Sequence, residues 1–268
     1  MRPLNKGPPI GYVSAMLEKL FRSARRTAPH IPQVPEGTRV YAIGDIHGRS
    51  DLLERMHGLI MCDARDFAGS RKVVVYLGDY VDRGLGSREV VELLIHSPLD
   101  GFVPVYLKGN HEQLLLDFLD GSVLFRDWMA YGGDATLYSY GVGLKGPRIR
   151  PESHDEMLEK FHTNLPNHHT DFYRNLSLTN SEGDYFFAHA GVRPGVALAE
   201  QTETDILWIR NEFLDWDENF GKVVVHGHSI TPAPDVRHNR IGIDTGAFAT
   251  GQLTCLVLEG EGRHFLST

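Results

Sequence analysis

Four short polar motifs in this sequence each follow an apolar run that is typical of a β-strand. The motifs are Gly44-Asp-Ile-His-Gly48, Gly78-Asp-Tyr-Val-Asp-Arg-Gly84, Gly109-Asn-His-Glu112 and Gly227-His-Ser229. A strand that stops at glycine and continues with Asp, His or Asn places oxygen and imidazole donors at the carboxyl edge of its sheet. Because four such edges can converge, the sequence predicts a site that holds two metal ions.

Apolar runs and helical patterns alternate from Arg39 onward. The expected strands are residues 40–43, 73–77 and 102–107, and the expected helices are 51–67, 87–96 and 112–119. This alternation is typical of βαβ units, which form a largely parallel sheet with right-handed crossovers.

Later strand-like runs indicate a second sheet packed on the first. These runs are residues 185–188, 222–225, 240–243 and 253–257. The last two are close in the chain, so we expect them to pair as antiparallel strands.

Residues 121–183 interrupt the alternation and contain few strand-like runs. They include Trp128, the run Tyr131-Gly132-Gly133 and a helical pattern at 153–162. We interpret 121–183 as a helical insertion over the sheet edge within a domain at 37–268. Because it lies between Asn110 and His189, we expect it to shape substrate access.

The first 36 residues form a separate arm that is rich in proline and basic side chains. Apolar residues at helical spacing predict a short amphipathic helix at 11–26. This helix either packs on the domain or belongs to a loose arm. A basic helix with an apolar face would also suit docking to a partner or to a membrane surface.

Composition excludes some classes of function. The net charge of −8 and the isoelectric point of about 5.9 argue against nucleic acid as an electrostatic partner. We find no 18-residue apolar run and no apolar signal-peptide core, so we expect no transmembrane segment. Cys62 and Cys255 lack ligand-like spacing, which favours a reduced cytoplasmic setting.

The residue types in the motifs match the needs of a catalytic metal pair. Asp45 and His47, two residues apart, can bind one ion together, and Asp79 can bridge two ions with its two oxygens. The candidates for completing the shell of the second ion are Asn110, His189 and His228. This mixture of donors suits Mn, Fe or Zn better than Ca or Mg, and we expect two ions, with Mn as the first choice.

Two ions can hold a bridging hydroxide that attacks phosphorus directly, so no phosphoenzyme is expected. His111 is placed to protonate the leaving oxygen, and Asp82 could hold its imidazole in the useful tautomer. Arg83 and Arg210 are candidates for binding phosphate oxygens in a bidentate manner, and Asn110 for a contact there as well.

Each motif alone has a simpler structural explanation. A Gly-Asp pair after a strand is usually only a turn, and the Gly109-Asn-His-Glu112 run could be a turn with a helix cap. His189 could be a hydrogen-bonded loop histidine, and His226 and His228 could point to opposite faces of a strand. The joint occurrence of the motifs after successive strands favours the metal site.

Together with His189-Ala-Gly191, these motifs resemble the phosphoprotein phosphatase family of dinuclear calcineurin-like metallophosphoesterases, and its bacterial branch in particular. The resemblance implies a four-layer α/β/β/α sandwich, of mixed α/β and α+β character, with metals at the edge of its central sheets. It implies one ion on Asp45, His47 and Asp79, and a second on Asp79, Asn110, His189 and His228. It also implies a His111–Asp82 acid pair and a phosphate contact from Arg83. The run Leu207-Trp-Ile-Arg210 is similar to the family segment with a second phosphate-binding arginine.

Three further polar residues have no settled role. His226 is interpreted as a neighbour of the ligands, with ligation as the alternative. Arg193 is either a substrate contact or a surface charge, and Asp244 resembles a family turn and is interpreted as structural.

The leading functional hypothesis is a serine/threonine protein phosphatase, with phosphotyrosine as a further substrate, within the class of metal-dependent phosphomonoester hydrolases. The alternative keeps the chemistry and changes the substrate to a dinucleoside polyphosphate such as diadenosine tetraphosphate, cleaved symmetrically. A third hypothesis, an inactive fold that serves as a binding module, is disfavoured because all the expected ligands, both members of the acid pair and both arginines are present.

Overall fold

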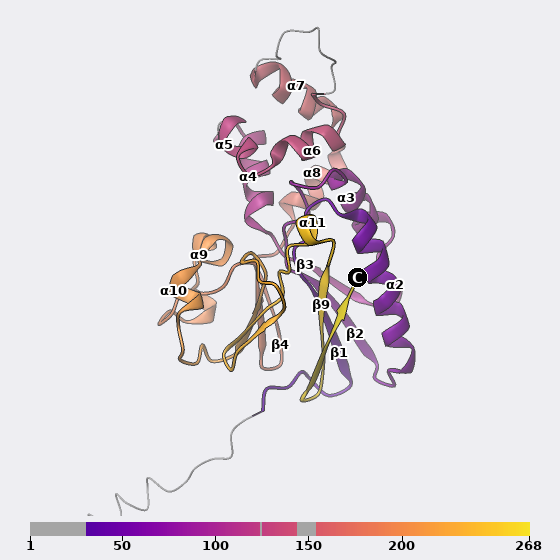
Figure 1. Ribbon diagram of the computed structural model, residues 1–268, viewed down its shortest axis with the longest axis vertical. Helices are drawn as coiled ribbons and strands as arrows, with labels where there is room; N and C mark the ends of the chain where they lie inside the picture. The colour runs from indigo at the N-terminus through magenta and orange to yellow at the C-terminus, as the bar shows by residue number, and fades with distance from the viewer. Residues whose placement is uncertain (1–30, 124, 144–153) are drawn as a thin grey trace, which may run out of the picture. The chain divides into compact units, whose positions relative to one another are not determined.

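The computed structural model describes residues 31–123, 125–143 and 154–268 (Figure 1). The helix expected at 11–26 lies outside these residues. Residues 32–268 form one compact unit with two five-stranded sheets. No helix in the described residues is long and apolar enough to cross a membrane.

The first sheet contains the three parallel strands that the sequence predicts. Its order is β10-β9-β1-β2-β3. The parallel strands are β1 (Thr38–Ile43), β2 (Arg71–Tyr76) and β3 (Val103–Tyr106). The connecting helices are α2 (Ser50–Asp63), which continues into η1 (Ala64–Asp66), and α3 (Ser87–His96). The predicted βαβ alternation is therefore confirmed in this half of the chain.

The second sheet has the order β4-β5-β6-β8-β7. Its strands are β4 (Thr179–Glu182), β5 (Tyr185–Ala188), β6 (Val223–His226), β7 (Asp235–Val236) and β8 (Arg240–Gly242). Strands β5, β6 and β8 run parallel, and β4 and β7 close the edges as antiparallel strands.

The expected pairing of residues 240–243 with 253–257 is wrong. Strand β8 belongs to the second sheet, whereas β9 (Thr254–Glu259) belongs to the first. The chain passes between the sheets through α11 (Ala247–Thr250). Strand β9 instead forms a hairpin with β10 (Gly262–Ser267) and pairs with β1, so both its edges are occupied within the first sheet.

The two sheets pack face to face around one apolar layer. Val40 and Ala42 of β1 meet Phe187 of β5 and Val225 of β6 in this layer. Alternate residues of β1, such as Tyr41 and Ile43, point the other way and pack with the helices of the first sheet. Strands buried on both faces explain the continuous apolar runs in the sequence.

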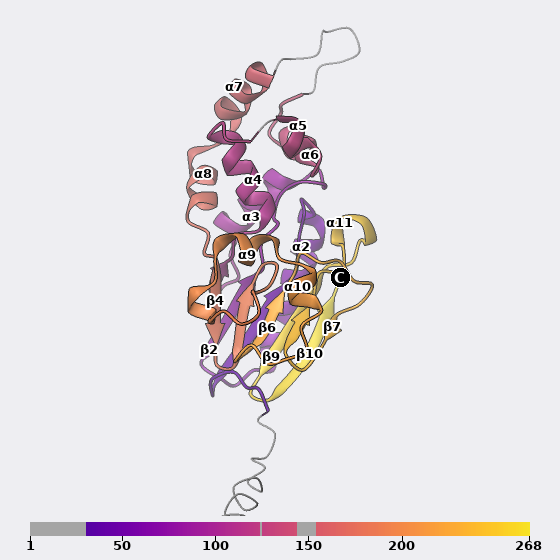
Figure 2. The ribbon, with the colours of Figure 1, turned by 90° about the vertical axis from the view of Figure 1, so that its left-hand side faces the viewer.

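Helices complete the outer layers. Figure 1 shows α2 and α3 on one side of the sheets, with α9 (Glu203–Trp208) and α10 (Asn211–Leu214) on the other. Figure 2 shows α9 and α10 in front of the second sheet, where Phe213 packs against Val224 and Ala188. The predicted α/β/β/α sandwich is confirmed.

The described residues of the segment at 121–183 are mainly helical before β4. Helix α4 (Asn110–Leu119) precedes it, and it contains α5 (Phe125–Met129), α6 (Gly133–Ser139), α7 (His154–Asn164) and α8 (Asn167–Arg174). Its last residues form β4 and so belong to the second sheet. Trp128 is fully buried against Phe118 and Phe161, which anchors this segment to α4.

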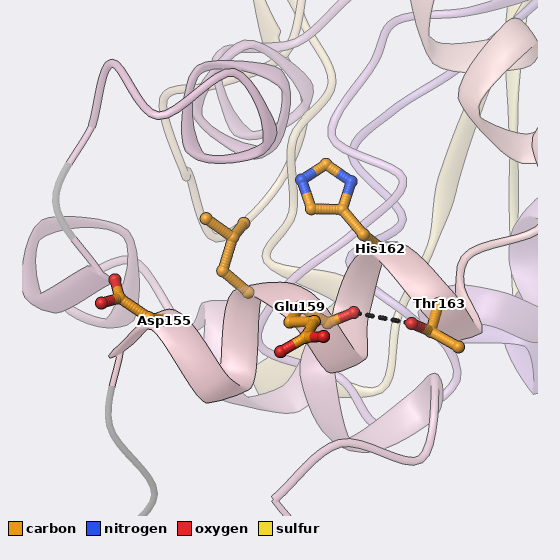
Figure 3. A pocket seen from close by; sticks show the side chains of 5 residues that line it. Asp155, Glu159, His162 and Thr163 are labelled. Atoms are coloured by element: carbon orange, nitrogen blue, oxygen red, sulfur yellow. Dashed lines mark hydrogen bonds between the residues drawn. The ribbon is translucent and has the colours of Figure 1, made fainter.

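Helix α7 also has a hollow of its own on the surface. Figure 3 shows Asp155, Leu158, Glu159, His162 and Thr163 lining it. None of these residues comes from the predicted motifs, so this hollow is separate from the predicted site.

The layer between the sheets allows a direct test of the packing. We expect Phe187→Ala to destabilise the protein by about 3–5 kcal/mol, because it leaves a cavity between two sheets. Phe187 is 0% exposed, whereas Phe265 on β10 is 37% exposed and provides the matched control. Urea denaturation should show Phe265→Ala within about 1 kcal/mol of wild type. Equal losses for the two variants would contradict this packing.

Candidate dinuclear metal centre

The predicted site residues come together where strands of both sheets end. Asp45 follows β1, Asp79 follows β2, and Asn110 begins α4 after β3. His189 and His228 follow β5 and β6 of the second sheet. The amide of His228 donates to Oδ2 of Asp45 over 3.0 Å, so the two sheets are joined at the site itself.

Asp79 is shared by two groups of potential metal ligands. One group contains His47, Asp79 and His111, and the other contains Asp79, His189 and His228. Oδ2 of Asp79 lies 3.4 Å from Nε2 of His47, and Oδ1 lies 3.4 Å from Nε2 of His189. Its two oxygens thus face different groups, as a bridging carboxylate requires.

Asn110 completes the second group. Its Oδ1 lies 2.9 Å from Nε2 of His189 and 2.8 Å from Nδ1 of His228. Gly109, which precedes it, lies so close to Asp79 that a Cβ atom would overlap the carboxylate. A glycine is therefore needed there for Asn110 to approach the bridging residue.

Three buried polar atoms at the centre have no hydrogen-bond partner in the described structure. They are Oδ1 of Asp45, Nε2 of His47 and Nε2 of His228. Buried polar atoms in proteins are normally hydrogen-bonded, so unpaired ones concentrated in one place require an explanation. The site residues fit divalent metal ions, which would bind such oxygen and nitrogen atoms.

Backbone carbonyls orient two of the imidazoles. Nδ1 of His47 lies 2.8 Å from the carbonyl oxygen of Val81, and Nδ1 of His189 lies 2.9 Å from that of Leu77. A hydrogen bond of this kind places the proton on Nδ1 and leaves Nε2 free as a ligand.

Burial keeps two imidazoles of the centre uncharged, so that they do not repel a bound cation. It lowers the pKa of His47 to about 3 and that of His228 to about 2, so both imidazoles are neutral at pH 7. Burial, reinforced by Asp244 and Asp79, raises the pKa of Asp45. Bound cations would stabilise the ionised carboxylate and offset its desolvation.

The backbone at the site is strained. Within the described ranges, the non-glycine residues with positive φ are His47, Asp79, Asp82, Arg83 and His228, with φ between 46° and 69°. All five belong to the predicted site. Side chains with a Cβ rarely adopt this conformation, which costs on the order of 1–3 kcal/mol per residue and is tolerated where function requires it.

His111 and Asp82 form a closely hydrogen-bonded pair. Nδ1 of His111 lies 2.7 Å from Oδ2 of Asp82, and both side chains are buried. Nε2 of His111 faces the centre, 3.8 Å from Oδ2 of Asp79. Burial lowers the pKa of His111, but Asp79 and Asp82 outweigh this effect and leave it raised.

The helical segment holds this pair in place. Nε1 of Trp128 donates to Oδ2 of Asp82 over 3.0 Å, and Oγ1 of Thr136 donates to Oδ1 over 2.6 Å. From the sequence alone, Trp128 is only one residue of the insertion, and Thr136 is not a candidate site residue. Neither residue has a sequence signal that names its partner, because α5 and α6 meet Asp82 only through the tertiary fold.

Glu112 has a role at the site that was not predicted from the sequence. Its buried carboxylate accepts the amides of Asp79 (2.8 Å), Tyr80 (2.7 Å) and Gly109 (2.9 Å). The signal was present, since an acidic residue three positions after a helix N-cap indicates a capping interaction. Here the same carboxylate also holds the turn that presents Asp79.

The two arginines lie beside different residues of the centre. Nη2 of Arg83 is 3.2 Å from Nε2 of His111, and its guanidinium lies over the ring of Phe248. Arg210 is exposed, and its Nη1 lies 3.4 Å from Oγ of Ser229, next to His228.

His226 and Arg193 lie outside both ligand groups. The ring of His226 is buried edge-on against Phe213, with centroids 4.9 Å apart. The guanidinium of Arg193 forms an ion pair with Asp205 of α9 at 2.6 Å. These contacts favour a packing role for His226 and a surface ion pair for Arg193.

The carboxyl group of Asp244 is part of a turn and also affects the charge of Asp45. Its Oδ1 accepts the amide of Gly246 over 2.9 Å, which supports the turn interpretation. Its carboxyl is buried and also contributes to raising the pKa of Asp45. It therefore shapes both the turn and the charge around the first group.

Proteins of known sequence and structure resemble this chain over most of its length. The serine/threonine-protein phosphatase 2 of Salmonella typhimurium is 28% identical over 227 residues, which are 80% of this chain and 90% of the relative. The asymmetrical bis(5'-nucleosyl)-tetraphosphatase PrpE of Anoxybacillus flavithermus is 24% identical over 234 residues, 80% of this chain and 88% of the relative.

Solved structures share the fold at low sequence identity. A candidate diadenosine tetraphosphatase superposes with a TM-score of 0.57 at 20% identity, over 89% of this chain and 98% of that one. A cold-active protein tyrosine phosphatase gives 0.55 at 17% identity, over 90% and 83% of the two chains.

Burial raises the pKa of Glu112 to about 8, so its role is tested through its acceptor oxygens, by replacing the carboxyl group with an amide of the same shape. We expect Glu112→Gln to destabilise the protein by about 2–4 kcal/mol, because an amide group would then face backbone donors in a buried site. Urea denaturation measures this loss, with the exposed Glu261→Gln as the matched control. A stability equal to that of the control would show that the carboxylate does not hold the Asp79 turn.

A comparison with protein-family profiles agrees with the fold, with the motifs and with their order in the chain. The sequence profile of the calcineurin-like phosphoesterases matches residues 38–245, which include all the predicted site residues. The chain belongs to the calcineurin-like phosphoesterase family.

Proposed function

We propose that this protein is a metal-dependent phosphomonoester hydrolase that acts on phosphoserine, phosphothreonine or phosphotyrosine in proteins. The observation that carries this proposal is the position of Asp79. Its carboxylate faces both ligand groups and lies 3.8 Å from the imidazole of the His111–Asp82 pair. Ligands for two ions and a proton donor are thereby brought to one point.

We assign the predicted ligands to two ions. One ion is held by Asp45, His47 and Asp79, and the other by Asp79, Asn110, His189 and His228. His111 is the alternative ligand for the first group, but Asp82 occupies its Nδ1 and the guanidinium of Arg83 lies 3.2 Å from its Nε2. The hydrogen bond from Nδ1 to Asp82 gives His111 the partner that a proton-donating imidazole needs, so we assign His111 as the acid and not as a ligand.

The donor set indicates the kind of ion. Carboxylate, amide and imidazole donors together suit Mn, with Fe or Zn as alternatives. Two such ions supply the positive charge that acidifies a water molecule and neutralises phosphate oxygens.

The side chains around the ions then have distinct tasks. Arg83 and Arg210 bind the non-bridging phosphate oxygens and orient the ester. Water attacks phosphorus directly, and Nε2 of His111 gives its proton to the leaving oxygen as the ester bond breaks. Asp82 accepts the Nδ1 proton of His111 in a hydrogen bond, which fixes the tautomer and the ring orientation.

The cysteines agree with direct hydrolysis. Cys62 is exposed on α2 and Cys255 is buried in β9, so neither thiol is part of the centre. An exposed free thiol also supports our proposal of a cytoplasmic, reducing location.

The acid role of His111 predicts an effect that depends on the leaving group. We expect His111→Asn to lower kcat for a phosphoserine peptide by about 10²–10⁴-fold, because the serine oxygen needs a proton. The loss for p-nitrophenyl phosphate should be smaller, since its leaving group is stable without one. Steady-state kinetics of the Mn-loaded enzyme measure both.

Two further variants make this test specific. Asp82→Asn should show the same dependence on the leaving group, whereas the exposed His238→Asn should leave both rates unchanged. Equal losses on both substrates for His111→Asn would indicate that His111 binds metal or substrate and does not act as the acid.

Two aromatic residues beside the centre, Tyr131 and Trp208, bear on the choice of substrate. We call them the rim. Tyr131 is 40% exposed and lies 5.8 Å from His111 between ring centroids. The ring of Trp208 lies 5.9 Å from that of Tyr131 and 6.4 Å from that of His228. Such rings could stack on the phenyl group of phosphotyrosine or on a nucleobase.

The second candidate function is hydrolysis of dinucleoside tetraphosphates. The rim aromatics and the PrpE relatives support it, and the Salmonella relative supports the protein phosphatase. The sequence analysis expected symmetrical cleavage for this alternative, whereas those relatives are described as asymmetrical.

A matched substrate panel decides between the two. We expect kcat/KM for a phosphopeptide to exceed that for diadenosine tetraphosphate by at least about tenfold, with turnover abolished by a chelator and restored by Mn. A preference for the dinucleotide would replace our first choice, and its products, two ADP or ATP with AMP, would identify the cleavage mode. Trp208→Ala should raise KM for phosphotyrosine or dinucleotide substrates and leave that for phosphoserine unchanged.

A further inference from the structure

A second cluster of metal-binding side chains lies between α3 and α8. It consists of Glu92 and His96 of α3 and His168 of α8, whose ligand atoms all lie within 4.8 Å of one another. None of these residues belongs to the predicted motifs or to the candidate centre.

Helix geometry brings the three ligands together. Glu92 and His96 are four residues apart and therefore lie on one face of α3. Nε2 of His96 is 3.4 Å from Oε2 of Glu92, and Nε2 of His168 is 3.9 Å from Oε1. A tetrahedral ion with bonds of about 2.0–2.2 Å separates its ligand atoms by roughly 3.3–3.6 Å, so only small side-chain rotations are needed.

A buried histidine points into the same cluster. His169 is 0% exposed, and its Nε2 lies 3.2 Å from Oε1 of Glu92 without forming a well-aligned hydrogen bond. Its Nδ1 is engaged by the hydroxyl of Tyr140 at 2.7 Å. This buried nitrogen faces Glu92 from the interior, and its close approach limits how the carboxylate can turn.

Three imidazoles surround this one carboxylate. The ring centroids of His96 and His168 are 5.4 Å apart, and those of His168 and His169 are 4.5 Å apart. A single hydrogen-bonded pair would need only one of these rings. Nε of Arg88 also lies 3.9 Å from Oε1 of Glu92, so the carboxylate has a guanidinium neighbour as well. The imidazoles, unlike the guanidinium, have nitrogen lone pairs that can bind a cation.

We propose that Glu92, His96 and His168 bind one zinc-like divalent ion, with water in the fourth position and His169 orienting the carboxylate. Two imidazoles and one carboxylate are a ligand set that Zn²⁺ prefers, whereas Mg²⁺ and Ca²⁺ prefer oxygen. The exposed sides of His96 and His168 leave an entry path from solvent.

An ion at this point would join the helical segment to α3. At its first residue, α3 carries Ser87, whose Oγ accepts the amide of Asp82 over 3.1 Å. In α8, Phe172 packs on Tyr80, which follows Asp79, with ring centroids 5.6 Å apart. The ion therefore acts as a clip between two helices that both support the catalytic turn, and it takes no part in the chemistry.

Zinc binding and heat stability test the clip together. The Mn-loaded protein is dialysed against Zn²⁺, and wild type is compared with the double variant His96→Ala/His168→Ala. We expect the double variant to bind one equivalent of zinc fewer, while any exchange at the intact catalytic centre is equal in both. Zinc at saturation should raise the Tm of wild type by roughly 5 °C more than that of the variant.

Controls separate the clip from folding and from surface binding. His162→Ala, an exposed histidine of α7, should bind as much zinc as wild type. Glu92→Gln removes a ligand with little change in shape, so it should lose the same equivalent even if the double variant folds poorly. Equal zinc stoichiometry and equal Tm shifts in wild type, Glu92→Gln and the double variant would overturn the proposal.

Discussion

The centre depends on the carboxylate of Asp79, which lies between the two candidate ligand groups and is held there by backbone hydrogen bonds and by charge. Its amide is fixed by Glu112, its Oδ1 accepts the amide of His111, and its φ of 52° points it away from β2. Burial alone would raise the pKa of Asp79, but surrounding histidines, His189 foremost, keep it below the ordinary value. The fold therefore maintains an ionised carboxylate where the two sheets meet, and this charge attracts cations to the centre.

The helical segment contributes to chemistry through Asp82. A glutamate or aspartate that fixes a histidine must itself be fixed, and here Trp128 and Thr136 each donate to one oxygen of Asp82. Trp128 can do so because it is buried between Phe118 and Phe161. Packing of α5 and α6 thus supports Asp82, which in turn orients His111, so the stability of that segment is linked to the proposed acid.

The sequence predicted most of the fold and the centre because their signals are local. Apolar runs that end in Gly-Asp or Gly-Asn-His mark both the strand and the candidate ligand that follows it, as at Asp79 and Asn110. The pairing of β8 and β9 was mispredicted because closeness in the chain does not determine which sheet a strand joins. The partners of Asp82 were missed for a similar reason, since 46 residues separate it from Trp128 and only tertiary packing brings them together.

Substrate choice depends on accessible side chains around the centre, whereas the candidate ligands themselves are buried. The ligands are buried and mutually constrained, so they determine how a phosphoester is hydrolysed but contact little beyond the phosphate. Tyr131 and Trp208 are more accessible and lie outside the set of candidate ligands. These residues can change without disturbing Asp79, which provides a physical reason why relatives with protein and dinucleotide phosphatase names share one family. Specificity in this protein should therefore respond to substitutions at the rim, whereas metal binding and proton transfer should not.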